Sequence, residues 1–381
     1  MKTRAAILSD FDHERPYAKT KPLSIEELEL EEPSYGEVLV RVESAGVCHS
    51  DLSTIQGILT KPLPIVLGHE AAGIVERVGP GVTTLSPGDK VVFSFVPTCG
   101  KCTPCVSGRP ALCEPGNRAN AAADLLRGTR RFRRNGVTIG HHLGVSGFSE
   151  YTVAAEESLI RIPSDVPGEI AAVFGCAALT GLGGVIHAAR VEPGMSVAIF
   201  GGGGVGLMAL LGALLVGAYP IIVVDPVEKK RKKALELGAT VAIDPTAGDT
   251  AKQLKDATGG EGPQFAFEVS GTTRAFEEAV VSVARGGTMV AIGIPRGSEK
   301  AQISPALLVY GDRTLRGAFM SSSVPRRDIP RYVELWRAGK LPVEKLISGT
   351  MGLEKLNEAM DALASGEAFR TMICPHVTAN V

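Results

Sequence analysis

The segment GVCHSD, Gly46 to Asp51, places a thiol, an imidazole, a hydroxyl and a carboxylate side by side. Thiolates and imidazoles are zinc ligands. However, cysteine is often a buried apolar residue, and histidine and aspartate are common in loops. The segment by itself therefore leaves two interpretations open: a surface turn, or the start of a metal site with distant ligands.

A second group of such residues lies in CGKCTPCVSGRPALC, within a lobe at about 97–115 that holds four of the seven cysteines. Their spacing lets four thiolates close around one tetrahedral ion, and zinc suits them because it favours sulfur and brings no redox chemistry. The alternatives are free buried thiols or an iron–sulfur cluster. Four sulfurs leave no position for substrate, so the sequence predicts a structural zinc with ligands Cys99, Cys102, Cys105 and Cys113.

A glycine-rich segment, FGGGGVG, follows the apolar run SVAI, and Gly201, Gly203 and Gly206 have the G-x-G-x-x-G spacing. Such glycines allow a tight turn and the close approach of a pyrophosphate to the amides at a helix start. The next apolar run, IIVV, ends at Asp225, where a carboxylate would bind the ribose hydroxyls of the adenosine. The alternative is a tight turn without a ligand. The order strand, loop, helix, strand favours a dinucleotide site.

The nature of the dinucleotide depends on two opposing features. Asp225 favours NAD, because its charge would repel the 2′-phosphate of NADP. The basic run KKRKK, Lys229 to Lys233, could attract that phosphate, although a solvated helix face explains it more simply. We expect NAD, with Lys230 reaching the ribose.

Two different patterns of elements must position these motifs, as 381 residues are too many for one ordinary core. Up to about residue 165 the chain has short apolar runs separated by turn residues, which predicts an irregular β-rich domain. From about Gly175, strands alternate with helical stretches, which predicts a doubly wound α/β parallel sheet. The tail looks too small to fold alone and should return to the first domain. We expect a catalytic domain over 1–177, a nucleotide-binding domain over 178–317 and a returning segment over 318–381.

Composition narrows the function classes. The chain has 40 Lys and Arg against 41 Asp and Glu, so no global field attracts nucleic acid or an acidic membrane. The uncharged stretch 193–224 is long enough for a membrane span, but glycines and Pro220 divide it into strand, helix and strand. The N-terminus does not read as a signal peptide. We therefore expect a cytoplasmic enzyme with a small neutral ligand.

Two further motifs complete the pattern: LGHEAAG, with His69 and Glu70, and FGCAALTG, with Cys176. Nearly end to end, the chain now resembles the zinc-dependent alcohol dehydrogenases of the medium-chain dehydrogenase/reductase superfamily. The motifs that carry the resemblance are GVCHSD, GHE, the four-cysteine lobe, RGTRRFRRNGVTIGHHLGVSGFSEYTV, GGGGVG, VVD and FRT. The resemblance implies a GroES-like first domain and a Rossmann second domain.

The resemblance also implies a second, catalytic zinc held by Cys48, His69 and Cys176, with the fourth position open to water or substrate. Two thiolates and one imidazole form a neutral site with Zn²⁺ that still acts as a Lewis acid. Asp51 would orient His69, and Glu70 would exchange with the open position in some states. Each chain should therefore hold two zinc ions and transfer hydride between an alcohol or aldehyde and NAD.

The remaining implied roles concern the proton, the cofactor and the substrate. Ser50 matches the family hydroxyl that accepts the alcohol proton, but Ser53 stands where liver-type enzymes often carry the histidine that ends the relay. Because a hydroxyl passes a proton without storing it near pH 7, the last relay step is open. Thr180 and Val205 would press the nicotinamide ring, and His49 and Arg370 would meet the pyrophosphate. The predicted pocket wall is apolar, favours an aliphatic or aromatic alcohol, and consists of Leu59, Phe95, Phe319 and Ile294, the last also beside the cofactor.

Three alternatives share this scaffold or its cofactor site. A glutathione- or other thiol-dependent formaldehyde dehydrogenase would use Arg118 to contact the thiol's carboxylate, although Leu59 replaces the acidic residue common in such enzymes. A non-catalytic nucleotide-binding protein and a zinc-free quinone reductase are both disfavoured, because the three zinc ligands and Ser50 are present. The segment TLRGAFM is expected to form an edge strand that pairs subunits into a homodimer or homotetramer.

Overall fold

The structure is a computed structural model that describes residues 1–11 and 13–377. The chain divides into two compact units: one contains Met1–Cys176 and the segment from Val324 onward, and the other is Ala177–Ser323. Residues 318–323, expected with the returning segment, lie in the second unit, where Ser323 Oγ donates a hydrogen bond to the Leu179 carbonyl at 2.8 Å.

The first unit begins with a closed barrel, in the strand order β1-β2-β7-β8-β4. These strands are β1 (Lys2–Leu8), β2 (Leu23–Leu30), β4 (Ile65–Val66), β7 (Phe132–Arg134) and β8 (Val137–His141). Side chains such as Ile7, Leu28 and Phe132 form its buried core. Strand β4 pairs in parallel with β8, Val66 opposite His141, and this register determines which residues meet beyond both strands.

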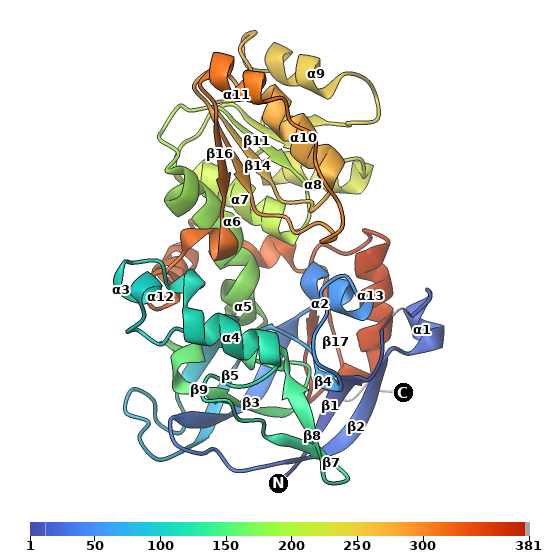
Figure 1. Cartoon of the computed structure of the whole chain (residues 1–381), viewed down its shortest axis with the longest axis vertical. Coiled ribbons are helices and arrows are strands. Elements are labelled where there is room, and N and C mark those ends of the chain that lie inside the picture. The colour runs from blue at the N-terminus through green and yellow to red at the C-terminus, as the bar shows by residue number, and fades with distance from the viewer. Residues whose placement is uncertain (12, 378–381) are drawn as a thin grey trace. The chain divides into compact units, whose positions relative to one another are not determined.

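A seven-stranded sheet forms the rest of this unit, in the order β10-β6-β5-β3-β18-β17, with β9 also paired to β3. Its strands are β3 (Glu37–Gly46), β5 (Glu70–Val78), β6 (Lys90–Phe93), β9 (Tyr151–Ala155), β10 (Leu159–Ile162), β17 (Gly349–Met351) and β18 (Thr371–Ile373). The central strand β3 is mostly buried, as EVLVRVESAG suggests, and irregularities in its register with β5 bend it before Cys48. The C-terminal segment returns to this sheet, and α13 (Leu356–Ala364) lies beside α1 (Tyr17–Thr20) (Figure 1).

The second unit is a six-stranded, wholly parallel sheet in the order β13-β12-β11-β14-β15-β16. Its strands are β11 (Val197–Phe200), β12 (Ile221–Val224), β13 (Val241–Ile243), β14 (Phe265–Glu268), β15 (Thr288–Ala291) and β16 (Thr314–Gly317). Helices flank the sheet (Figure 1), so central strands such as VAIF are buried along their whole length. The predicted α/β fold with a Rossmann sheet and a β-rich domain is confirmed, and β16 is an edge strand, as expected.

The remaining helices connect these sheets. The α-helices are α2 (His49–Ile55), α3 (Thr103–Val106), α4 (Glu114–Ala122), α5 (Gly168–Val173), α6 (Leu179–Gly183), α7 (Gly204–Leu215), α8 (Glu228–Leu237), α9 (Thr250–Asp256), α10 (Thr273–Ser282), α11 (Pro305–Gly311) and α12 (Pro325–Arg337). Short 3-10 helices are η1 (Pro110–Leu112), η2 (His142–Gly144), η3 (Glu156–Ser158), η6 (Phe319–Ser322), η7 (Val343–Leu346) and η8 (Leu353–Lys355), and π-helical turns are η4 (Phe174–Ala178) and η5 (Gly184–Ala189).

One helical run, Gly168–Ala189, has the length and composition of a membrane span, but 83% of its most apolar window is buried inside the protein. It is a core helix. The uncharged stretch 193–224 contains strand β11, helix α7 and strand β12, as predicted from its glycines and Pro220.

Candidate active site

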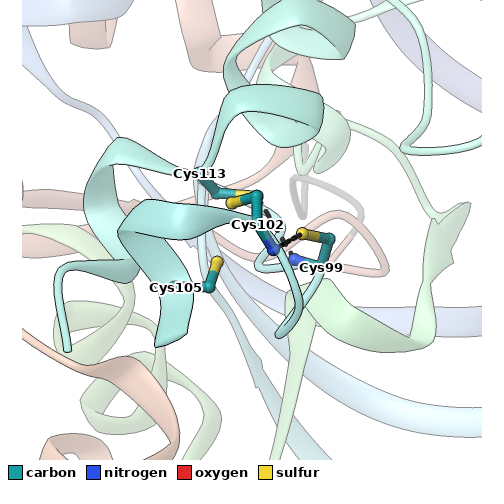
Figure 2. Close-up of side chains that lie close together, drawn as sticks. All are labelled: Cys99, Cys102, Cys105 and Cys113. Carbon is teal, nitrogen blue, oxygen red and sulfur yellow. Dashed lines mark hydrogen bonds between the residues drawn. The ribbon is translucent and has the colours of Figure 1, made fainter. Parts of the chain in front are cut away.

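The four cysteines of the predicted structural site lie together in the first unit. Their sulfurs are all within 4.8 Å of one another (Figure 2). Two backbone amides donate to sulfur, from Cys99 to Cys113 Sγ at 3.2 Å and from Cys102 to Cys99 Sγ at 3.4 Å. The short helix α3 carries Cys105, and Cys113 precedes α4, so local turns converge the four side chains.

The protonation of these thiols fits a metal site. Burial would raise the pKa of Cys102, but backbone amides of Cys105 and Glu114 outweigh burial and lower it to about 7. Burial and a hydrogen bond with Cys102 raise the pKa of Cys105 to about 12. The four sulfurs lie close enough together for one cation to bind all of them. A tetrahedral Zn²⁺ would replace the shared protons with four metal–sulfur bonds.

A second cluster brings together Cys48, His69 and Cys176, whose ligand atoms also lie within 4.8 Å of one another and are buried. Cys48 follows the bent strand β3 and caps α2, His69 immediately precedes β5, and Cys176 lies in the π-helical turn η4. Such turns are uncommon within helices and occur often at functional sites. Three segments far apart in the sequence thus supply one donor set.

The spacing of this cluster suits zinc. Cys176 Sγ lies 3.5 Å from His69 Nε2. Zinc–sulfur and zinc–nitrogen bonds of about 2.3 and 2.0–2.1 Å, set at a tetrahedral angle, separate the two atoms by about 3.5 Å. A hydrogen bond with Cys176 holds the pKa of the Cys48 thiol well below its usual value. Two cysteines and a histidine at these separations are a donor set for a divalent cation, and three protein ligands leave one position of a tetrahedral site for another ligand.

Asp51 contacts the ring nitrogen of His69 that does not face the Cys176 sulfur. Asp51 Oδ1 lies 3.0 Å from His69 Nδ1 and accepts the Gly68 amide at 3.2 Å, while Oδ2 accepts the Cys48 amide at 3.3 Å. Burial would raise the pKa of Asp51, but the imidazoles of His69 and His142 outweigh burial and hold that pKa below its usual value. The contact between Asp51 and His69 is the one that the resemblance implied, and the role of Asp51 in orienting His69 toward a metal stays a prediction.

Glu70 and Arg370 form a buried ion pair beside this cluster. Arg370 Nη1 lies 3.2 Å from Glu70 Oε2 and donates to the Val47 carbonyl at 3.1 Å. Burial opposes its charge, yet the negative charges of Glu70 and of the Cys48 and Cys176 thiolates raise the pKa of Arg370 above its usual value. The role of Glu70 as an exchanging ligand and that of Arg370 at the pyrophosphate both stay predictions.

The proton-relay and pocket residues of the first unit lie around α2 and β6. Ser50 and Ser53 are three residues apart on α2 and so share one face of it. Phe95 lies edge to face against His69, with ring centroids 5.8 Å apart, so an apolar ring borders the metal ligand. Leu59 is partly buried, and His49 is exposed at the start of α2.

The glycine-rich loop of the second unit fits a pyrophosphate. Gly201 has φ +113°, and a side chain at Gly206 would approach the Gly201 carbonyl oxygen to 1.8 Å, so both positions require glycine. A Cβ at Gly203, in contrast, would meet no atom within 4 Å. The space left open at Gly203, at the start of the twelve-residue helix α7, is what a phosphate approaching the amides needs.

Asp225 lies at the end of β12, where its carboxylate ties the loop to the strand. Oδ2 accepts the Gly202 amide at 2.7 Å and Oδ1 accepts the Val227 amide at 2.8 Å, while Lys230 Nζ lies 3.9 Å from Oδ2. Within KKRKK, Arg231 pairs with Asp244 at 2.9 Å and Lys232 pairs with Glu228 at 2.8 Å. These side chains serve intramolecular pairs, which supports the interpretation of the run as a helix face.

The other predicted cofactor and pocket residues also belong to the second unit. Thr180 and Val205 are partly exposed on α6 and α7, and Ile294 and Phe319 are 54% and 43% exposed. Their joint action with Leu59 and Phe95 stays a prediction. One residue absent from the predictions is His142, which contacts Asp51; its only signal in the sequence is the pair HH after the strand GVTIG.

Comparison with known proteins agrees with this geometry. Residues 34–164 match the alcohol dehydrogenase GroES-like domain, and residues 204–337 match the zinc-binding dehydrogenase family. An alcohol dehydrogenase zinc-binding domain protein from Burkholderia ambifaria is 35% identical, with a TM-score of 0.92 and coverage of 99% of this chain and 100% of the other.

Two further solved structures are similar over almost the whole chain. Benzyl alcohol dehydrogenase from Acinetobacter calcoaceticus is 32% identical, with a TM-score of 0.91 and coverage of 98% of this chain and 99% of the other. A zinc-binding dehydrogenase from Sinorhizobium meliloti 1021, bound to NADP, is 25% identical, with a TM-score of 0.80 and coverage of 98% and 100%.

Proposed function

The chain belongs to the zinc-binding alcohol dehydrogenases of the medium-chain dehydrogenase/reductase superfamily, and we propose that it oxidises apolar aliphatic or aromatic alcohols with NAD. The observation that carries this proposal is the buried Cys48–His69–Cys176 cluster with Asp51 behind the histidine. Bound there, zinc would act as a Lewis acid that lowers the pKa of an alcohol hydroxyl, and NAD would accept the hydride.

The residues around the cluster then have defined tasks. Asp51 keeps the Nδ1 of His69 protonated and its Nε2 directed at the metal position. The Ser50 hydroxyl accepts the proton of the alcohol, and Ser53, one turn further on α2, passes it on without storing it. Phe95 excludes water beside His69. Cys99, Cys102, Cys105 and Cys113 hold the structural zinc.

Apolar alcohols are proposed as substrates because the predicted wall offers no charged side chain. Its members Leu59, Phe95, Ile294 and Phe319 would match an alkyl or aryl group and leave the hydroxyls of a polyol unpaired. The likeness to a benzyl alcohol dehydrogenase supports an aromatic alcohol. NAD is proposed because both oxygens of Asp225 lie at the end of β12, where a ribose would bind.

The proposed assembly and location follow from the fold and the thiols. Strand β16 is the edge of its sheet and is exposed along Thr314–Gly317, so two copies could pair there in a homodimer or homotetramer. Thiolate metal sites require reduced cysteines, which favours the cytoplasm.

A substrate panel tests the proposal. We expect kcat/KM for benzyl alcohol and 1-hexanol with NAD to exceed that for glycerol at least about 100-fold, and Cys48→Ala to abolish both activities. Formaldehyde oxidation that requires glutathione would instead support the thiol-dependent alternative, in which Arg118, exposed on α4, contacts the thiol's carboxylate. A preference for polyols would contradict the proposed substrate class.

A further inference from the structure

His142 is a second histidine in contact with the Asp51 carboxylate. Its Nδ1 lies 3.2 Å from Asp51 Oδ1, the same oxygen that meets His69 Nδ1 at 3.0 Å. The rings of His69 and His142 also contact each other edge to face, with centroids 5.5 Å apart and planes at 88°. One carboxylate oxygen thus contacts two imidazoles, and His69 is the one that belongs to the cluster with Cys48 and Cys176.

Both histidines and the carboxylate are shielded from water. Asp51 is 0% exposed, and His69 and His142 are each 1% exposed. A buried carboxylate needs donors on all sides, and its other contacts are the amides of Gly68 and Cys48. Oδ1 also lies 3.2 Å from His142 Nδ1, and removal of that imidazole would leave a free space into which the carboxylate could rotate, away from His69.

The fold places His142 there through backbone pairing. Since β4 and β8 run in parallel with Val66 opposite His141, the chains that leave them carry His69 and His142 to the same place. The Ser146 side chain links the ends of the two strands, because its Oγ accepts a hydrogen bond from the His142 amide at 3.0 Å and donates one to the Val66 carbonyl at 2.9 Å.

The turn that follows His142 is held in a costly conformation. Leu143 and Ser146 have φ of 53°, in the left-handed region that side chains with a Cβ rarely adopt. Opposite this turn, Gly68 has φ +90°, and a Cβ there would lie 2.5 Å from the Phe148 nitrogen. Strained residues persist only where the surrounding contacts hold them. These contacts therefore fix His142 against Asp51.

We infer that His142 is a positioning residue for the catalytic metal: it locks the Asp51 carboxylate, and through it the ring of His69, in the orientation that binds zinc. The inference rests on the proposed function of the Cys48–His69–Cys176 cluster. Residues that orient a metal-binding histidine typically change metal affinity about 10- to 100-fold when replaced.

The test compares leucine and asparagine at position 142 with leucine at position 141. Asparagine places an amide N–H near the position of Nδ1, whereas leucine fills similar space without a donor. His141 is the matched control, because it is equally buried and adjacent but accepts the Arg131 amide through Nε2 at 3.1 Å and packs on Phe132. Each full-length variant is measured for zinc affinity by chelator competition and, after cobalt exchange at the catalytic site, for its visible absorption spectrum.

We expect His142→Leu to weaken catalytic zinc binding about 10- to 100-fold and to shift the cobalt bands, while the four-cysteine site stays loaded. His142→Asn should recover most of the affinity, and His141→Leu should leave affinity and bands unchanged even where it lowers Tm. If His142→Leu does not fold, His142→Gln replaces it, because its longer side chain carries the amide past Asp51.

Wild-type affinity and bands in His142→Leu, or equal losses in His142→Leu and His142→Asn, would overturn the inference while leaving the proposed function intact. A wild-type chain that binds no metal at Cys48, His69 and Cys176 would overturn both. The two failures are therefore distinguishable by the wild-type metal content alone.

Discussion

Replacement of Asp225 should narrow the preference for NAD over NADP. The carboxylate is 4% exposed and lies where the adenosine ribose would bind, so its charge acts through protein as well as water. At a separation of about 5 Å and an effective dielectric constant of about 20, two unit charges repel by about 3 kcal/mol, which corresponds to about 100-fold in affinity. We expect loss of the charge to narrow the ratio of kcat/KM values by about 10- to 100-fold.

Two variants separate this charge effect from damage to the loop. Asp225 accepts two amides, from Gly202 at 2.7 Å and Val227 at 2.8 Å. In Asp225→Asn, the side-chain oxygen can still accept one of these backbone amides, but the side-chain NH₂ group faces the other. In Asp225→Ala, both backbone amides lose their acceptor. Each lost bond to a charged group costs about 1.5–3 kcal/mol. Asp225→Ala should therefore lose more activity with NAD than Asp225→Asn, whereas the NAD:NADP ratio should narrow similarly in both.

The assay is kcat/KM for benzyl alcohol oxidation with each cofactor at one ionic strength, with Lys232→Ala as the control for the basic run. Lys232 pairs with Glu228 and is 69% exposed, so its removal should leave the ratio unchanged. An unchanged ratio in both Asp225 variants would refute the reasoning. A wild-type enzyme that is more efficient with NADP would show that the basic run outweighs the carboxylate.

Three other predictions concern the metals, the proton and pH. Elemental analysis should find two zinc ions per chain, and a single zinc in the fully loaded wild type would contradict the two-site prediction. Cys48→Ala should remove one ion and the activity with little loss of stability. Cys102→Ala should lower Tm, because a closed four-cysteine site stabilises the fold directly. Ser50→Ala should nearly abolish alcohol oxidation. Ser53→His should add or shift an ionisation in the single-turnover pH profile, since a histidine stores a proton near pH 6.5. Identical pH profiles of the wild type and Ser53→His would mean that the proton leaves by another route. Burial, with Arg130 and Arg131 nearby, lowers the pKa of His141 from 6.5 to about 3, so between these values only the unfolded chain binds this proton and stability falls as pH decreases. At pH 5 this loss of folding stability is about 2 kcal/mol. In His141→Gln, whose Oε1 can still accept the Arg131 amide, Tm should decrease less from pH 7 to pH 5 than it does in the wild type. Equal decreases of Tm in the two proteins would refute this assignment.

Much of the fold was predictable because its signals are local. The alternation of apolar runs with helical stretches after Gly175 predicted the parallel sheet, and the glycines within 201–206 predicted the loop at the start of α7. Strand pairing was harder to predict. The barrel joins β4 to β8, and the sheet of the first unit joins β3 to β18, although long segments of chain separate these partners.

The sequence by itself determined the types of donor available and the grouping of Cys99, Cys102, Cys105 and Cys113, because a short chain segment limits how far apart its side chains can lie. A resemblance was needed to join Cys48, His69 and Cys176, and even that did not indicate His142. Only the tertiary structure decided that Asp51 contacts two imidazoles at once. The physical reason is that contacts between distant segments depend on strand register and backbone turns. A shift of one residue between β4 and β8 would turn the side chains of one strand to the opposite face and separate His142 from the carboxylate.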